Sequence, residues 1–188
     1  MSNGTFKILG IAGSIRQGSY NRGLLRAAQE LAPRGVDIQT FDITPVPLYN
    51  ADVEAQGDPE PVRQFKQQIR EADALLIATP EYNYNIPGLL KNAIDWASRP
   101  PTNSVLRHKP IAIMGASTGS FGTVRAQLAL RQAFLFTESY VLLKPEVLVS
   151  KAQSRFDEHG NLTDEDTREL IITLVKALVD WTHRLKTD

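Results

Sequence analysis

The sequence contains no cysteine and only three histidines, His108, His159 and His183. Without cysteine, the chain can form no disulfide, no iron–sulfur cluster, no thiol redox centre and no cysteine-based zinc site. The histidines lie far apart and none has the spacing of a metal-binding motif, so we expect no metal site. Any redox activity would therefore depend on a bound organic cofactor.

The chain also lacks an excess of charge and any long apolar run. Lys plus Arg and Asp plus Glu each total 21, so charge gives no reason to expect nucleic acid or an anionic membrane as a partner. No apolar run approaches the roughly 18 residues that a membrane span requires. Residues 1–5 have neither the basic nor the apolar segment of a secretory signal, so we expect a cytoplasmic protein.

What the sequence does contain is an ordinary globular composition. Hydrophobic residues make up 42% of its 188 residues and charged residues 22%, which excludes a disordered chain. No repeat or linker divides the sequence. We therefore expect a single domain over residues 1–188.

Short apolar runs alternate with segments of helical periodicity. Strands are predicted over residues 6–12, 36–43, 74–79 and 110–116, and two short candidates, 141–143 and 147–149, flank Lys144-Pro145. Helices are predicted over residues 21–31, 62–72, 89–97, 124–136 and 164–185, the last capped by Thr163, and residues 44–61 read as a long connection. This alternation predicts an α/β flavodoxin-like three-layer sandwich, with a five-stranded parallel sheet of order 2-1-3-4-5 and helices on both faces.

In such sheets, ligands bind beyond the carboxyl ends of the strands. The turn after the first strand, residues 13–21, is rich in hydrogen-bond donors. Ser14 and Ser19 offer hydroxyls, Arg16 adds a charged donor fork, and Asn21 could cap the helix or reach a ligand. Together with the N-terminus of the helix, these groups suit a terminal phosphate. The alternative is a polar turn with a Ser or Asn cap, since neither a Walker A nor a GxGxxG motif is present.

The turn after the third strand, residues 80–88, begins at Pro80 and is stiffened by a second proline. Tyr82 and Tyr84 offer aromatic faces to a planar ligand, and Asn83 and the backbone amides could bond the edge of a heterocycle such as a flavin. Glu81 could brace the loop instead of touching ligand. The alternative is an ordinary surface turn that happens to contain tyrosines.

The turn after the fourth strand is short, polar and flexible. The hydroxyls and N–H groups of Ser117, Thr118, Gly119 and Ser120 could bond the polar chain and carbonyl groups of the same ligand. Alone, this segment could equally be a plain Gly/Ser connection. Three such turns at one edge of the sheet are less easily explained by chance than any one of them.

At these residues the sequence resembles the NADPH-dependent FMN reductase family, which includes quinone, azo-dye and chromate reductases. The matching segments are residues 13–21, 80–100, 115–134 and 144–149, so the likeness covers nearly the whole chain. The resemblance implies noncovalently bound FMN. The residues that it implies around the phosphate are Ser14, Arg16, Ser19, Tyr20 and Asn21. Those that it implies along the flavin ring and ribityl chain are Pro80, Glu81, Tyr82, Asn83, Tyr84, Ser117, Thr118, Gly119 and Ser120.

The resemblance also implies dimers or tetramers and a ping-pong reaction. NADPH or NADH would give a hydride to FMN, and a quinone, azo compound, free flavin or metal oxyanion such as chromate would then take the electrons. No side chain need act as an acid or base in this chemistry, so we assign no catalytic residue. The alternative is a flavodoxin-type electron carrier, a binding module that nicotinamide nucleotides do not reduce directly.

Three further features have more than one interpretation. The helix segment containing Trp96 could pack into the core or form a dimer face. Arg125 and Glu146 could bridge subunits or form an ordinary surface pair. Asp42 ends the second strand where a dinucleotide-binding domain holds ribose, but without GxGxxG we interpret it as a loop anchor.

Overall fold

The computed structural model of the chain describes residues 4–187. The first three residues, part of the segment in which we expected no signal, lie outside it. The strands are β1 (Phe6–Ala12), β2 (Val36–Phe41), β3 (Ala74–Ala78), β4 (Pro110–Ala116), β5 (Tyr140–Val141) and β6 (Val147–Val149). The α-helices are α1 (Tyr20–Glu30), α2 (Ala51–Glu54), α3 (Glu60–Glu71), α4 (Gly88–Ala97), α5 (Val124–Phe136) and α6 (Glu165–Thr187), and the 3-10 turns are η1 (Pro101–Asn103) and η2 (Ala152–Ser154).

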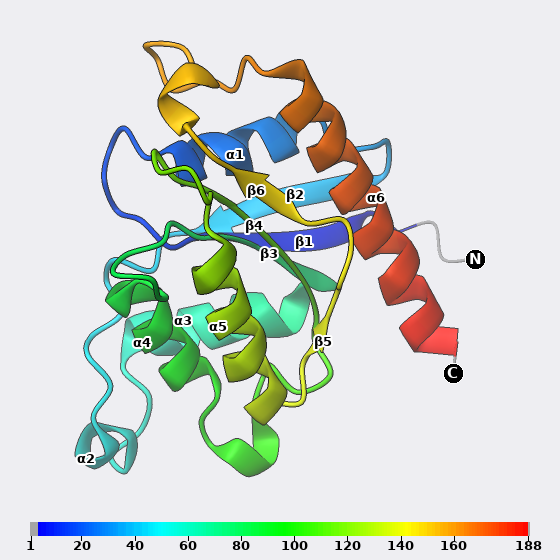
Figure 1. Cartoon of the computed structure of the whole chain (residues 1–188). Coiled ribbons are helices and arrows are strands. Elements are labelled where there is room, and N and C mark those ends of the chain that lie inside the picture. The colour runs from blue at the N-terminus through cyan, green and yellow to red at the C-terminus, as the bar shows by residue number, and fades with distance from the viewer. Residues whose placement is uncertain (1–3, 188) are drawn as a thin grey trace.

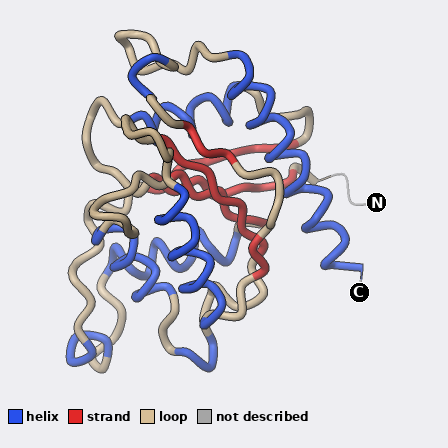
Figure 2. Tube along the Cα trace, viewed as in Figure 1, coloured by secondary structure: helices blue, strands red, loops and turns tan. Residues whose placement is uncertain are grey.

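All paired strands run parallel, in the order β2-β1-β3-β4-β5, and β6 also pairs with β4. β5 pairs with the start of β4 and β6 with its end, so the two short strands share the fifth position of the sheet. The predicted order is thus confirmed, with the fifth strand divided at the segment that contains Lys144-Pro145. Figure 2 shows this sheet between two layers of helices.

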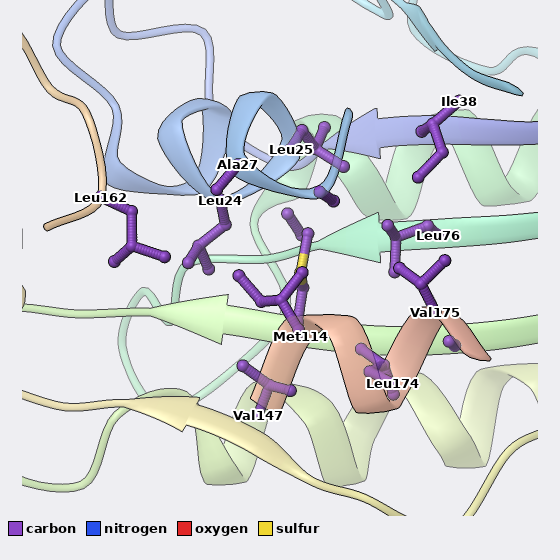
Figure 3. Packing of buried hydrophobic residues seen from close by; sticks show 14 of the residues in the cluster. Leu24, Leu25, Ala27, Ile38, Leu76, Met114, Val147, Leu162, Leu174 and Val175 are labelled. Atoms are coloured by element: carbon purple, nitrogen blue, oxygen red, sulfur yellow. The ribbon is translucent and has the colours of Figure 1, made fainter. Parts of the chain in front are cut away.

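The helices cover both faces of the sheet, as predicted (Figure 1). α1 and α6 pack on one face around Leu24, Met114 and Leu174, all 1% exposed or less (Figure 3). α3, α4 and α5 pack on the other, around Phe65, Trp96 and Phe134. Because β3 and β4 are buried along their whole length, their continuous apolar runs fit a strand covered on both sides.

Several element ends differ from the predictions. β2 ends at Phe41, because the Asp42 carboxylate turns the chain by accepting bonds from the N–H and hydroxyl of Thr44. The loop-anchor interpretation of Asp42 is confirmed. The expected long connection contains one helical turn, α2, whose N-cap is Asn50.

The structure overturns one predicted helix cap and decides between two alternatives for another. Asp164, not Thr163, caps α6, since its carboxylate accepts the N–H of Thr167 at 3.1 Å. The Thr163 hydroxyl instead donates to the carbonyl of Arg155. At α1, where either Ser or Asn could cap the helix, the cap is Ser19, whose hydroxyl accepts the N–H of Arg22.

None of the helices in residues 4–187 combines the length and apolar character needed to cross a bilayer. The same residues contain no group of three or more Asp, Glu or His side chains that could hold a metal ion.

Candidate functional site: the carboxyl edge of the sheet

The register of the sheet brings the three polar turns together. Ala12 of β1 lies beside Ala78 of β3, Ala78 lies beside Met114 of β4, and Ala116 lies beside Val149 of β6. The turns that follow β1, β3 and β4 therefore leave the sheet at one edge. In Figure 2 they gather at the left-hand end of the strands.

The first turn has the backbone of an anion cradle. Within the described chain, none of the N–H groups of residues 14–18 donates to a protein acceptor. Five consecutive N–H groups without a protein partner, just before the N-terminus of a helix, suit a bound anion such as a phosphate. Ser19 caps α1, and Gly18 has nothing within 4 Å of the position its Cβ would occupy, which leaves room beside the turn.

The side chains of this turn divide into two groups. Arg16 is exposed and lies 5.4 Å from the centre of the Tyr20 ring, which in turn packs 5.0 Å from the Phe156 ring. Asn21 is 3% exposed and points away from the turn. Its amide donates to the carbonyl of Ala116 and accepts the N–H of Ala116, both at 2.9 Å. Asn21 thus fixes the end of β4 relative to α1, and both its polar atoms are already paired.

The second turn is a tight hairpin. Tyr82 and Asn85 exchange backbone hydrogen bonds of 3.1 and 3.0 Å, and the residues between them, Asn83 and Tyr84, have φ values of 51° and 63°. Two positive φ values in succession define a type I′ turn, which is costly for a residue as bulky as tyrosine. The conformation leaves the rings of Tyr82 and Tyr84 52% and 70% exposed. Strained backbone with exposed aromatic side chains is typical of a ligand-binding loop.

Glu81 holds this turn against α5. One carboxylate oxygen accepts the N–H groups of Arg125 and Ala126 at 2.9 and 3.1 Å, and the other accepts Nη1 of Arg125 at 3.2 Å. Thr123, at the N-cap position of α5, makes no capping hydrogen bond, so Glu81 caps the helix from 44 residues away. Glu81 therefore braces the loop, the first of its two predicted roles, and its side chain is only 8% exposed.

Arg125 joins the second and third turns. Its guanidinium lies 4.0 Å from the centre of the Tyr84 ring and 4.7 Å from that of Phe121. Within the chain, Glu146 does not pair with Arg125: its carboxylate accepts a hydrogen bond from Lys144 Nζ at 2.6 Å. The ordinary surface pair of Arg125 with Glu146 was therefore wrong, because the carboxylate of Glu81 lies at the start of α5 and takes the guanidinium. A bridge between Arg125 and Glu146 of two subunits stays a prediction.

The third turn stays open to solvent. Thr118, Gly119 and Ser120 are exposed, and the Ser117 hydroxyl accepts the N–H of Gly119 at 3.1 Å. Across the edge, the hydroxyls of Ser14 and Tyr82 lie 3.4 Å apart and link the first turn to the second. The structure thus brings all three predicted turns into contact, directly or through Arg125.

Sequence reasoning missed Arg125 and Phe121 as parts of this site. Both belong to a matching segment, residues 115–134, but their roles depend on contacts with Glu81 and Tyr84 that no local pattern reveals.

The structure decides between the two interpretations of Trp96. The Trp96 ring is fully buried, and its Nε1 donates to the carbonyl of Pro47. The core interpretation of Trp96 is confirmed.

The parallel sheet, its strand order and the helices on both of its faces define a flavodoxin-like protein. The NADPH-dependent FMN reductase family model matches residues 6–154. An NAD(P)H-dependent FMN reductase of Pseudomonas aeruginosa is 54% identical over 180 residues, covering 96% of this chain and 97% of the relative. An NAD(P)H:quinone oxidoreductase of Solanum tuberosum is 45% identical, covering 96% of this chain and 94% of the relative.

Among solved structures, FerB of Paracoccus denitrificans, a flavoenzyme NAD(P)H:acceptor oxidoreductase, superposes with a TM-score of 0.86. It is 35% identical, and the match covers 95% of this chain and 98% of FerB. The chain belongs to the NADPH-dependent FMN reductase family. It is therefore an FMN-dependent oxidoreductase that uses a nicotinamide nucleotide.

Proposed function

We propose that residues 1–188 act as one domain that binds FMN at the carboxyl edge of the sheet and passes electrons from NADPH or NADH to a small acceptor. The observation that carries the proposal is the row of unpaired N–H groups in residues 14–18, beside the tyrosine turn and linked to it through Ser14 and Tyr82. When bound, FMN supplies the redox chemistry by accepting a hydride and giving up the electrons.

The residues of the site divide by role. The phosphate would lie on the N–H groups of residues 14–18, with Ser14, Arg16, Ser19 and Tyr20 around it. The ring and ribityl chain would be lined by Pro80, Tyr82, Asn83, Tyr84, Ser117, Thr118, Gly119 and Ser120. Because their polar atoms are bonded within the protein, Asn21 and Glu81 would act by positioning these turns. No side chain would transfer a proton to or from substrate.

We propose quinones as the first class of acceptor, because the Solanum relative is a quinone oxidoreductase. Azo compounds, free flavins and metal oxyanions such as chromate remain further candidate acceptors. The exposed rings of Tyr82 and Tyr84 support a flat aromatic acceptor, which could stack at the open side of the site. We also propose a cytoplasmic location.

A homo-oligomer is supported by the outer side of α5. Leu128 and Leu135 lie two turns apart on this helix and are 59% and 79% exposed, and Phe136 beside them is 70% exposed. Large apolar side chains gathered on one surface often mark a contact between subunits. Phe121 and Tyr84 extend this surface to the proposed flavin site, so we propose a dimer, or a pair of dimers, assembled along α5.

The proposal is tested with FMN-reconstituted protein. We expect NADPH oxidation that requires a quinone, and rapid bleaching of the flavin absorbance when NADPH alone is mixed in a stopped-flow instrument. Flavin that binds but is not reduced directly would identify the electron carrier instead. No flavin binding would refute both.

Arg16→Ala tests the phosphate cradle. Loss of one charge-assisted contact costs about 1.5–3 kcal/mol, so the Kd for FMN should rise at least about ten-fold. Arg34→Ala is the matched control, since Arg34 is exposed in the turn after α1 and away from the three loops. Equal FMN affinity in both variants would place the phosphate elsewhere.

A further inference from the structure

A polar pocket lies next to the proposed flavin site, between the first turn and the end of β2. It is formed by the first turn, the outer side of α1 and the end of β2, and has a volume of about 230 Å³. Its polar wall includes Ser14, Gln17, Arg22, Arg26, Thr40 and Asp42. Neither Arg16 nor any residue of the tyrosine turn lines it, so this pocket is separate from the flavin site but shares Ser14 with it.

Two arginines give the pocket a positive side. Arg22 and Arg26 are four residues apart on α1, so their side chains lie on the same face of the helix. Arg22 is half-buried, and its guanidinium donates to no acceptor in residues 4–187. Arg26 is held by a bond from Nη2 to the carbonyl of Gly160 at 2.6 Å. Like charges at this spacing destabilise a helix unless an anion lies between them, so the pair favours an anionic ligand.

A carboxylate faces the arginines across the pocket. Asp42 Oδ1 accepts both bonds from Thr44, whereas Oδ2 accepts none from the described residues. The bond from the Thr44 hydroxyl, then that from its N–H, lowers the pKa of Asp42, with a smaller contribution from Arg22. Asp42 is thus ionised at neutral pH, with one oxygen available to a hydroxyl donor. A ligand that carries both a phosphate and a hydroxyl would satisfy both sides of the pocket.

Size and position indicate that only one end of a longer ligand fits here. Pockets for complete small ligands usually measure about 300–1,000 Å³, more than this one. Since Ser14 lines both sites, a ligand that reaches over the first turn would have its other end at the flavin. In dinucleotide-binding sheets, the end of the second strand holds the adenosine ribose, with an acidic residue for the hydroxyls or an arginine for a 2′-phosphate. This chain lacks their GxGxxG motif, but it has both residue types at that position, and Asp42 uses only Oδ1 to anchor its loop.

We propose that this pocket binds the 2′-phosphorylated ribose of NADPH, and that Arg22 makes the enzyme prefer NADPH over NADH. Arg22 and Arg26 would hold the 2′-phosphate, and Asp42 would accept the neighbouring ribose hydroxyl. The inference rests on the proposed function, because it assigns the donor-nucleotide end of that same site. Without the arginines, Asp42 would repel the phosphate and favour NADH.

Arg22→Ala is the first test, measured as KM for both nucleotides under a fixed quinone concentration. We expect the KM for NADPH to rise at least about ten-fold, and the KM for NADH to rise far less, because only NADPH carries the 2′-phosphate. Arg22→Gln keeps most of the side-chain stem and should show the same selective loss, which excludes a packing defect. Arg34→Ala should leave both KM values as in the wild type.

Direct binding supplies a readout that does not depend on turnover. FMN-loaded protein should bind adenosine 2′,5′-bisphosphate in calorimetry at least about ten-fold more tightly than adenosine 5′-monophosphate, and Arg22→Ala should abolish the difference. If the Asp42 carboxylate bonds only the ribose hydroxyl, Asp42→Asn should strengthen the binding of the bisphosphate or leave it unchanged. FMN affinity should stay constant in all these variants.

The possible failures are distinguishable. Flavin reduced by neither nucleotide would refute the proposed function itself. Flavin reduced by both, with equal KM changes in Arg22→Ala or equal binding of the two adenosine phosphates, would overturn the pocket assignment alone.

Discussion

Glu81 offers the sharpest test of how the site is held together. Its carboxylate accepts two backbone N–H groups at the start of α5 and the guanidinium of Arg125. The helix has no cap of its own, since Thr123 makes no capping bond. Glu81→Ala would therefore remove the cap of α5 and leave the N–H of Ala126, a fully buried residue, without an acceptor.

The expected loss follows from these contacts. Removing a helix cap costs about 1 kcal/mol, and a buried N–H left unpaired costs about 1–3 kcal/mol. Glu81→Ala should thus lower the free energy of unfolding by roughly 2–4 kcal/mol. Glu81→Gln keeps one acceptor oxygen and should lose about half as much. Arg125 would also be released from beside Tyr84, so FMN should bind more weakly in both variants.

Urea unfolding of FMN-free protein, followed by circular dichroism, measures the effect without a contribution from ligand binding. Glu146→Ala is the matched control, because within residues 4–187 the one side chain that bonds the Glu146 carboxylate is the exposed Lys144, and such pairs contribute at most about 1 kcal/mol. If Glu81→Ala and Glu146→Ala lost the same stability, the long-range cap would be refuted.

Three further changes test other parts of the fold by the same urea method. Asn21→Ala removes both buried bonds to Ala116 and should cost about 2–4 kcal/mol; a loss under 1 kcal/mol would contradict the strand-fixing role. Asp164→Ala removes the α6 cap and should cost about 1 kcal/mol at pH 7. Bonds from the Thr167 side chain and N–H lower the pKa of Asp164 in the folded state, so its contribution is complete above the ordinary pKa of Asp, about 3.9. The contribution is lost as pH falls through the lowered folded-state pKa, and the variant and wild type should converge below that pH. Asp58→Asn leaves Lys66, which is 2% exposed, without its carboxylate and should cost about 3 kcal/mol, whereas no change would show that the ion pair is dispensable.

Local patterns predicted the elements well where apolar periodicity and strong breakers coincide. β4, α5 and β6 have the predicted bounds to the residue. β4 is a continuous apolar run that starts at Pro110, and Lys144-Pro145 interrupts the last strand position. The errors lie at helix ends where either of two neighbouring residues could act as the cap, as with Asp164 and Thr163. Both residue types cap helices well, and only the folded geometry selects one.

The candidate site was predictable as a location but not as a set of contacts. Strand ends in a parallel sheet share an edge, so the three turns had to meet. The partners of Asn21 and Glu81, however, lie 95 and 44 residues away along the chain. No periodicity encodes such a pair, because a single polar side chain bonded to a distant backbone leaves no repeating pattern. For the same reason, the true partner of Arg125 could not be chosen from sequence.

These long-range bonds explain why strained turns persist at the edge of an otherwise regular sheet. The left-handed conformations of Asn83 and Tyr84 cost free energy that their own short hairpin does not recover. Glu81 and Arg125 connect that hairpin to α5, and Ser14 connects it to the first turn. A flat ligand with a phosphate end would contact both turns at once, and by mass action it would stabilise the arrangement that binds it. The bracing residues thus hold the binding geometry in place before the ligand arrives, which lowers the ordering cost of binding.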